Sequence, residues 1–230
     1  MENDDVIYAD RRAAGSRLAE ALRGYAGRPE VLVLGLPRGG VPVAAVVAEA
    51  LGAPLDVFLV RKLGFPGSEE FAMGAIASGG VRVLNEAMLA RYRVPASAVE
   101  AAAREEGREL RRREREYRGG RPPLDVRGRL VLLVDDGLAT GLSMQAAVAA
   151  LRSLGPQAIV VAVPVGPRET VAALRRIADD VVCPATPEPF DAVGRFYGVF
   201  DQTTDIEVKS LLARAADRES AAVGAKGEER

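Results

Sequence analysis

Short apolar runs alternate with helix-like segments along most of this sequence, and this alternation limits the folds that the chain can adopt. The runs lie at 31–35, 55–60, 130–134, 158–163 and 180–183. Their length and continuous apolar character are typical of strands that are buried on both faces. Strands of this kind, separated by helices, form a mostly parallel sheet that helices cover on both sides. We therefore expect an α/β fold.

The segments between these runs carry residues that start helices. Asp10 is placed to cap a helix over 11–25, and Asn85 is placed to cap a short helix after it. Thr204 and Glu207 have the spacing of a capping box that opens a last helix. In sheets flanked by such helices, ligands bind at the carboxyl ends of the strands.

The chain has the length of one large α/β domain. At 230 residues, of which 48% are hydrophobic, it can bury one large core and is too short for two. We expect a single domain over 1–214, with a helical insertion at 85–129 and a small C-terminal hood at 184–201. Residues 215–230 are polar and rich in Ala and Gly, so we expect a disordered tail.

Charge and composition indicate a cytoplasmic protein without nucleic-acid or membrane partners. The net charge of −1 gives no overall attraction to nucleic acid or to an anionic membrane. No apolar run is long enough to cross a bilayer, and the N-terminus does not resemble a signal peptide. The single cysteine, Cys183, cannot form an internal disulfide, and no cysteine cluster is present for a metal.

The sequence contains no histidine, and this excludes whole classes of chemistry. Serine–histidine and cysteine–histidine catalysis, HExxH zinc sites and imidazole proton transfer are all ruled out. Any chemistry must therefore use carboxylates, Lys or Arg, backbone N–H groups, or a metal that oxygen atoms hold.

The most informative loop follows the third apolar run, where Val131–Ser143 reads VLLVDDGLATGLS. A buried strand leads into a turn and then into a helix N-terminus. Gly137 and Gly141 allow backbone N–H groups to converge, and the hydroxyls of Thr140 and Ser143 add donors. Such a nest, backed by the positive end of a helix dipole, suits a phosphate monoester.

Asp135 and Asp136 would repel a phosphate at close range, so they suit sugar hydroxyls or a nearby divalent cation better. The alternative is an ordinary strand–turn–helix with an exposed acidic pair and capping hydroxyls. A P-loop is disfavoured because no GxxxxGK[ST] is present and Leu142 stands where its lysine would be. The dinucleotide pattern GxGxxG is also absent.

The segment VLLVDDGLATGLSM resembles the phosphoribosyl-pyrophosphate signature of type I phosphoribosyltransferases. Within that family, VDDxLATGxSM is most similar to the adenine-type branch. The resemblance extends, more weakly, from about residue 31 to 183. It implies a mostly parallel sheet flanked by helices and a site for phosphoribosyl pyrophosphate.

The resemblance assigns roles within this loop. Asp135 and Asp136 would bind the ribose 2′- and 3′-hydroxyls and act in catalysis. The 5′-phosphate and ribose would be held by Gly137, Leu138, Ala139, Thr140, Gly141 and Ser143. Members specific for 6-oxopurines carry an acidic residue where this chain has Ala139, which counts against hypoxanthine or guanine as the acceptor.

The loop LPRGG at 36–40 resembles the pyrophosphate loop of the family. The resemblance places Pro37, Arg38, Gly39 and Gly40 on the leaving group. The alternative is an ordinary glycine-rich turn between a strand and a helix, with a surface arginine.

The segment RKLGFPG at 61–67 resembles the mobile catalytic loop of the family, which closes over pyrophosphate. Arg61 and Lys62 would then stabilise charge on the departing pyrophosphate. Glu70 stands where adenine-type members have a carboxylate near the base. The alternative is that the two cations are solvated charges at the end of a strand.

Aromatic residues gather in the hood, in the stretch PEPFDAVGRFYGVFDQ. The resemblance suggests that Phe196 and Tyr197 stack on the base, and Phe190 lies nearby. The alternative for each of them is core packing.

A strongly charged helix is expected over 95–118. Residues 100–118 hold seven Arg and six Glu, so their net charge is only +1. A solvated helix with i,i+4 ion pairs is the default interpretation, and an oligomer contact or a nucleic-acid arm are the alternatives. The interleaved glutamates argue against nucleic acid. Members of the resembled family are commonly dimers, so we expect a homodimer.

The resemblance implies transfer of a phosphoribosyl group from phosphoribosyl pyrophosphate to a nitrogenous base, with Mg²⁺ on the pyrophosphate. The acceptor base stays open. Two alternatives remain, namely a non-catalytic sensor of nucleotides or phosphoribosyl pyrophosphate, and a hydrolase or phosphorylase that uses the same phosphate site.

Overall fold

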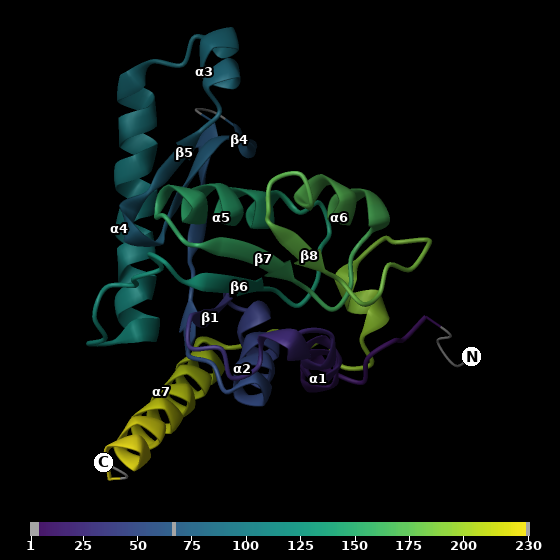
Figure 1. Cartoon of the computed structure of the whole chain (residues 1–230). Helices are drawn as coiled ribbons and strands as arrows, with labels where there is room; N and C mark the ends of the chain where they lie inside the picture. The colour runs from purple at the N-terminus through teal and green to yellow at the C-terminus, as the bar shows by residue number, and fades with distance from the viewer. Residues whose placement is uncertain (1–4, 66–67, 229–230) are drawn as a thin grey trace.

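A five-stranded parallel sheet forms the centre of the computed structural model, with strand order β2-β1-β6-β7-β8 (Figure 1). The structure describes residues 5–65 and 68–228, with the side chains of 68–71 and 222–228 left out. The strands are β1 (Val31–Gly35), β2 (Leu55–Val57), β6 (Leu130–Val134), β7 (Ala158–Ala162) and β8 (Asp180–Val182). This confirms the α/β fold that the alternating apolar runs predict.

Helices cover both faces of this sheet, as Figure 1 shows. On one side lie α1 (Arg11–Ala21) and α2 (Gly40–Leu51), and on the other lie α5 (Leu142–Ser153) and α6 (Arg168–Leu174). Every residue of β1 and β6 is buried, as strands with helices on both faces require.

The predicted helix caps are present. The Asp10 carboxylate accepts a hydrogen bond from the backbone N–H of Ala13 at 2.8 Å. Asn85 caps α3 (Glu86–Tyr92) in the same way, and the hydroxyl of Thr204 accepts from the N–H of Glu207 at 3.1 Å. These local signals start three helices where the sequence places them.

A second, antiparallel sheet stands beside the first and consists of β3 (Val60–Phe65), β4 (Ser68–Ala77) and β5 (Arg82–Leu84). The prediction of a loop over 61–67 is therefore wrong for residues 61–65. The backbone of Val60 pairs with Ala77 and that of Leu63 with Gly74. Leu63 is fully buried, so the hydrogen-bonded ladder and an apolar contact override the local Gly and Pro signals.

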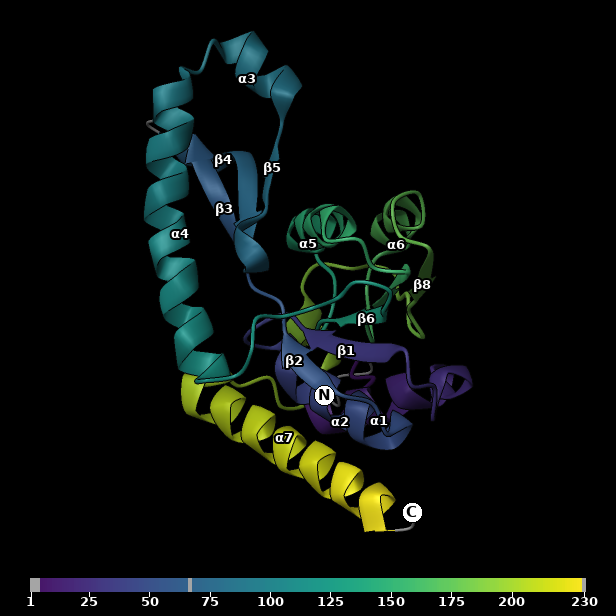
Figure 2. The ribbon, with the colours of Figure 1, turned by 60° about the vertical axis from the view of Figure 1, so that its left-hand side comes forward.

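The segment 85–129, predicted to be a helical insertion, contains α3 and the long helix α4 (Ala96–Arg118). Helix α4 stands along the three-stranded sheet and meets the last helix at its lower end (Figure 2). Val99, Ala103 and Leu110 bury one face of α4. The solvent side carries the expected ion pairs, such as Arg113 with Glu109 at 2.8 Å.

The last helix, α7 (Asp205–Glu228), corrects the expectation of a disordered tail from residue 215. Val208, Leu212 and Ala215 are buried in the main core. Further along, a carboxylate oxygen of Glu219 accepts a hydrogen bond from the N–H of Leu55 at 3.0 Å. Packing of one helical face thus overrides a polar composition.

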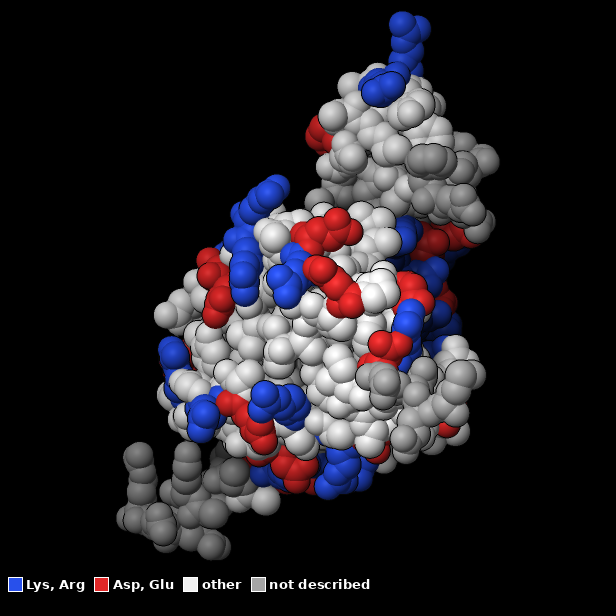
Figure 3. All heavy atoms as spheres, turned by 90° about the vertical axis from the view of Figure 1, so that its right-hand side faces the viewer, with Lys and Arg blue, Asp and Glu red and all other residues white. Residues whose placement is uncertain are grey.

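The surface carries mixed charge, and no membrane-spanning helix is found. On the face drawn in Figure 3, acidic and basic side chains are interspersed, in keeping with the net charge of −1. Among the described residues, none of the helices combines the length and the apolar character needed to cross a bilayer.

A buried ion pair anchors α4 to the main sheet, and its loss is expected to destabilise the whole chain. Arg118 donates three hydrogen bonds to Asp56 of β2, and the two side chains are only 11% and 12% exposed. Arg118→Met would leave a buried carboxylate without its charged partner, which costs about 3–5 kcal/mol. Urea unfolding measures this loss.

The control is Arg115→Met, because Arg115 is exposed on the same helix and has no ion pair within the described residues. Adding Asp56→Asn to Arg118→Met is expected to restore part of the stability. Equal stability of the Arg118 and Arg115 variants would contradict the anchoring role.

Candidate functional site

The parallel pairing of β1 and β6 brings two predicted loops together at the carboxyl ends of these strands. Gly35 is in register with Val134, and the N–H of Leu36 donates to the carbonyl of Val134 at 2.8 Å. The loop 36–40 and the loop 135–141 therefore start side by side. They face a shared cavity of about 550 Å³.

Glycine is required where the two loops touch. A Cβ atom on Gly39 would collide with Oδ2 of Asp136, and one on Gly40 would lie 2.8 Å from the Cα of Asp135. Side chains at these positions would push the loops apart. The glycines of LPRGG thus allow this loop to lie directly against Asp135 and Asp136.

The cavity brings together residues from both predicted loops, along with others that were not predicted. Its lining consists of Arg11, Pro37, Arg38, Gly39, Asp135, Asp136, Val193, Phe200, Gln202 and Thr203. The side chain of Arg38 also reaches to 3.9 Å from a carboxylate oxygen of Asp205 at the start of α7.

Asp136 is fixed by three hydrogen bonds. Nε of Arg11 donates to Oδ2 of Asp136 at 2.9 Å, and the exposed fractions of the two side chains are 14% and 15%. The hydroxyl of Tyr197 donates to the backbone carbonyl of Asp136 at 2.6 Å. The N–H of Asp136 donates to Oδ1 of Asp135 at 2.9 Å.

The acidic pair carries a strong electrostatic perturbation. Burial, followed by the neighbouring charge of Asp136, raises the pKa of Asp135 well above its ordinary value. Burial also raises the pKa of Asp136, although the hydrogen bond from Arg11 opposes this. Burial raises the pKa of Tyr197 as well, so its hydroxyl remains a donor. Perturbed carboxyl groups of this kind are typical of functional sites.

The loop 135–141 ends at the N-terminus of α5. Ala139, Thr140 and Ser143 are exposed, and Gly141 has φ +71°, a conformation that favours glycine. The hydroxyl of Thr170 donates to the carbonyl of Ala139 at 3.1 Å and steadies the turn. The first N–H groups of α5 have no partner within the helix and point outward, which suits an anion.

Leu138 is the exception in this loop. Its side chain is 2% exposed, and its N–H donates to the carbonyl of Val165 at 2.9 Å. The contact of Leu138 with a ligand therefore stays a prediction, and its side chain and its N–H are already engaged within the fold.

The two cations of the predicted catalytic loop lie away from the acidic pair. Nε of Arg61 pairs with Glu106 of α4 at 2.6 Å. Arg61 and Lys62 line a separate cavity between β3 and α4, and Lys62 also borders an apolar cavity next to Leu142. The side chain of Glu70 lies outside the described residues.

Phe196 and Tyr197, expected to stack on a base, are 1% and 5% exposed. They pack with Tyr8 in a small apolar cluster, so neither ring offers a free face here. Phe200, in the same hood segment, is 37% exposed and lines the cavity. These aromatic residues differ only in how deeply they are buried. The sequence of this segment has no hydrophobic periodicity that would predict which of them is buried.

Arg11 is another residue that sequence reasoning missed. Its guanidinium lies 4.0 Å from the ring centre of Phe200, beside Asp136. It is the first residue of α1, next to Arg12, and no motif marks it. A basic residue at the start of a helix, where the dipole does not favour it, is the one signal that could have drawn attention.

Within the described residues, no group of three or more His, Cys, Asp or Glu side chains could form a metal cage. Asp135 and Asp136 supply carboxylate oxygens at the cavity wall. Mg²⁺ commonly keeps several waters and binds through one or two carboxylates plus substrate phosphates. The pair therefore fits a cation that arrives with a phosphate ligand.

Comparison with known proteins agrees with this geometry. The family model described as "Phosphoribosyl transferase domain" matches residues 7–194. The chain belongs to this phosphoribosyltransferase family.

Two strains of Mycobacterium tuberculosis each have a protein named "Putative phosphoribosyl transferase" (Rv0571c in H37Rv, MT0597 in CDC 1551) that is 48% identical to the chain over 219 residues. The match covers 95% of this chain and 49% of each relative, so the chain spans about half their length. The crystal structure of TT1426 from Thermus thermophilus has 48% identity and a TM-score of 0.80, covering 89% of this chain and 97% of that one.

The contact between the two phosphoribosyltransferase loops gives a first test. Gly40→Ala would place a methyl group against the backbone of Val134 and Asp135. Overpacking of this kind costs about 1–3 kcal/mol, measured by urea unfolding. Gly120→Ala is the control, because a Cβ atom there meets nothing within 4 Å. Equal stability of the two variants would show that the loops are not in contact.

The raised pKa of Asp135 gives a second test. Between the ordinary value of 3.8 and the raised pKa, the folded protein holds a proton that the unfolded chain has released. Stability therefore falls as the pH rises through this window. Asp135→Asn removes the ionisation, so the variant is expected to melt at a higher temperature than the unmodified protein at pH 8, with a smaller difference near pH 4.

Asp191→Asn is the control of opposite sign. The hydrogen bond from Arg195 lowers the pKa of this exposed carboxyl, so its contribution is present at pH 8 and is lost on acidification. This variant is expected to be no more stable than the unmodified protein at pH 8. A lower melting temperature for Asp135→Asn at pH 8 would contradict the assigned shift.

Proposed function

We propose that this chain transfers the 5-phosphoribosyl group from phosphoribosyl pyrophosphate to a nitrogenous base and releases pyrophosphate. The observation that carries the proposal is the meeting, in one cavity, of a fixed acidic pair and the loop that begins at Pro37. The outward-facing N-terminus of α5 follows directly on the same chain segment as the acidic pair. Membership of the phosphoribosyltransferase family supports it.

The 5′-phosphate is assigned to the N-terminus of α5. The exposed turn at Ala139 and Thr140, together with Gly141 and Ser143, offers N–H and hydroxyl donors at the positive end of the helix dipole. Gly137 supports this turn, because a Cβ atom there would lie 2.5 Å from Val193.

The acidic pair is assigned to the ribose. Carboxylates accept hydrogen bonds from the 2′- and 3′-hydroxyls, and several lone pairs remain on Asp135 and Asp136 beyond those already used. Two carboxylates beside a phosphate site would otherwise be unfavourable. Ribose hydroxyl groups between the carboxylates and the phosphate donate hydrogen bonds to the carboxylates and keep the two kinds of negative charge apart.

Pyrophosphate is assigned to the loop 37–40. Arg38 supplies a positive charge, and the tight turn places its backbone beside Asp136. Mg²⁺ bound to the pyrophosphate would neutralise charge on the leaving group, and Asp135 and Asp136 are the residues near it. Arg61 and Lys62 reach this position only if the β3–β4 hairpin moves toward the cavity.

No covalent nucleophile is needed for this reaction, so the absence of histidine is no obstacle. The transition state resembles an oxocarbenium ion with weak bonds to both partners. The chain therefore contributes by holding donor and base in line and by placing charges that are fixed in advance.

The base is assigned to the side of the cavity formed by Phe200 and Val193. Phe200 has an exposed ring surface for stacking. Ala139 offers no carboxylate to a 6-oxopurine, and this agrees with the similarity of VDDGLATGLSM to the adenine-type signature. We propose an acceptor that does not need a carboxylate at this position, such as an aminopurine or a related nitrogen heterocycle.

Removal of the acidic charges tests the assignment. The double variant Asp135→Asn and Asp136→Asn is expected to lose at least about a hundredfold in pyrophosphate release, as catalytic hydrogen-bonding groups typically do. Its fold is expected to persist, since both amides keep the size of the carboxyls. Normal transfer by this variant with any accepted base would refute the proposal.

The acceptor is found with a panel of bases, each mixed with protein, phosphoribosyl pyrophosphate and Mg²⁺. Pyrophosphate release that requires one particular base identifies a transferase. Release without any base identifies a hydrolase, and binding without release identifies a sensor.

A further inference from the structure

We propose that Arg11 is a positioning residue that holds Asp136 in the orientation needed to accept a ribose hydroxyl. This inference rests on the proposed function, because it uses the assignment of the acidic pair to ribose. It adds a residue from α1, far from the central motif in the sequence, since 125 positions separate Arg11 from Asp136.

The two oxygens of the Asp136 carboxylate have different surroundings. Nε of Arg11 donates to Oδ2 at 2.9 Å. The same oxygen is packed against Gly39, where a Cβ atom would collide with it and would lie 3.2 Å from Oδ1. Oδ2 thus lies between an arginine and the backbone of Gly39, and among the described residues Oδ1 accepts no hydrogen bond.

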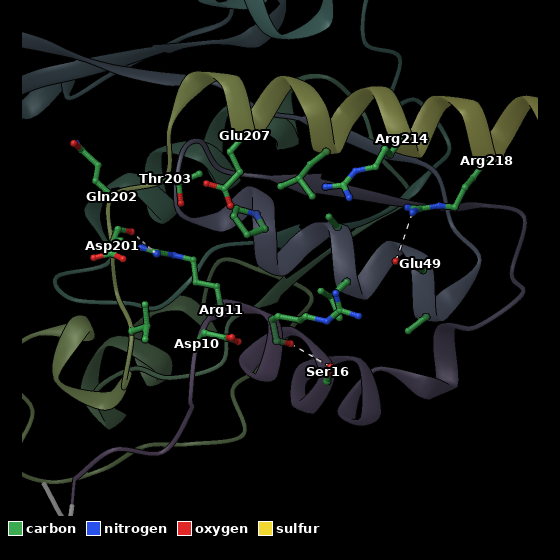
Figure 4. Close-up of a pocket in the computed structure, with 17 residues that line it drawn as sticks. Asp10, Arg11, Ser16, Glu49, Asp201, Gln202, Thr203, Glu207, Arg214 and Arg218 are labelled. Carbon is green, nitrogen blue, oxygen red and sulfur yellow. Dashed lines mark hydrogen bonds and ion pairs between the residues drawn. The ribbon is translucent and has the colours of Figure 1, made fainter. Parts of the chain in front are cut away.

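Arg11 is itself held in place by two contacts from the hood. Nη1 donates to the backbone carbonyl of Asp201 at 2.7 Å, and the guanidinium lies over the ring of Phe200 at 4.0 Å. Figure 4 shows Arg11 reaching from α1 toward Asp201, with Gln202 and Thr203 beside it. The side chain is only 14% exposed, so it has little freedom to leave.

Arg11 therefore joins three parts of the chain: α1, the acidic loop and the hood. It lies between the cavity at the acidic pair and a neighbouring cavity of about 660 Å³ bounded by α1, α2 and α7, and it lines both. A planar guanidinium can donate to Asp136 and to Asp201 at the same time, because its N–H donors form a rigid fork. Lysine has one charged centre and cannot bond Asp136 and Asp201 in the same way.

The experiment compares Arg11→Gln, Arg11→Lys and the control Arg12→Gln. Arg12 is the next residue of α1, is exposed, and has no ion pair within the described residues. The probes are ribose 5-phosphate and 2-deoxyribose 5-phosphate, whose affinities are measured by calorimetry. The ratio of the two affinities reports the contact of Asp136 with the 2-hydroxyl, the group that the second probe lacks, and is insensitive to a general loss of stability.

The unmodified protein and Arg12→Gln are expected to prefer ribose 5-phosphate by about tenfold, the value of a hydrogen bond to a charged group. Arg11→Gln is expected to lose this preference, with a ratio near one. Arg11→Lys keeps the positive charge and is expected to keep part of the preference for ribose 5-phosphate. Melting temperatures of all variants show whether each one is folded.

An unchanged preference in Arg11→Gln would overturn the inference. If Arg11→Gln does not fold, Arg11→Lys with the full preference would overturn it equally, because the charge alone would then suffice. If the unmodified protein shows the preference but releases no pyrophosphate with any base, the transferase proposal fails while Arg11 keeps its role. If it shows no preference, both the ribose assignment and the role of Arg11 fall.

Discussion

The parallel pairing of β1 with β6 is the constraint on which the rest of the site depends. It sets Gly35 beside Val134, so the chain leaves both strands at the same height and in the same direction. The two loops that follow must then share one space. Gly39 and Gly40 make this possible, because any side chain there would collide with Asp135 or Asp136. The register of two apolar strands thus decides where the charged groups lie.

Placing two carboxylates at this position is unfavourable for folding. Burial raises the pKa values of both Asp135 and Asp136, which means that their charged forms are less stable here than in water. Arg11 offsets part of this cost by donating to the carboxylate of Asp136. The charged forms of these carboxyl groups become more stable when a ligand supplies hydroxyl donors. The destabilised acidic pair and its proposed role in binding ribose are therefore two aspects of the same arrangement.

Sequence reasoning recovers what local patterns encode. The apolar runs predict the five strands, and VLLVDDGLATGLS predicts the loop at the end of β6, because strand, turn and helix start are all written into consecutive residues. Arg11 and Phe200 escape it because their role depends on contacts between distant segments. Phe196, Tyr197 and Phe200 look equivalent in the sequence. Only tertiary packing distinguishes them, because Tyr197 lies against Tyr8 and Phe196 lies against Phe190.

The segment RKLGFPG shows why the remaining part of the site could not be read from sequence. Its glycines and proline indicate a loop, yet residues 61–65 pair with β4 and Leu63 is buried. Arg61 is then tied to Glu106, so the hairpin is coupled to α4 through an ion pair of 2.6 Å. Any approach of Arg61 or Lys62 to pyrophosphate must either break that pair or carry α4 along. Arg118 also fixes the lower end of α4 to β2, so one ion pair ties this helix to each of the two sheets.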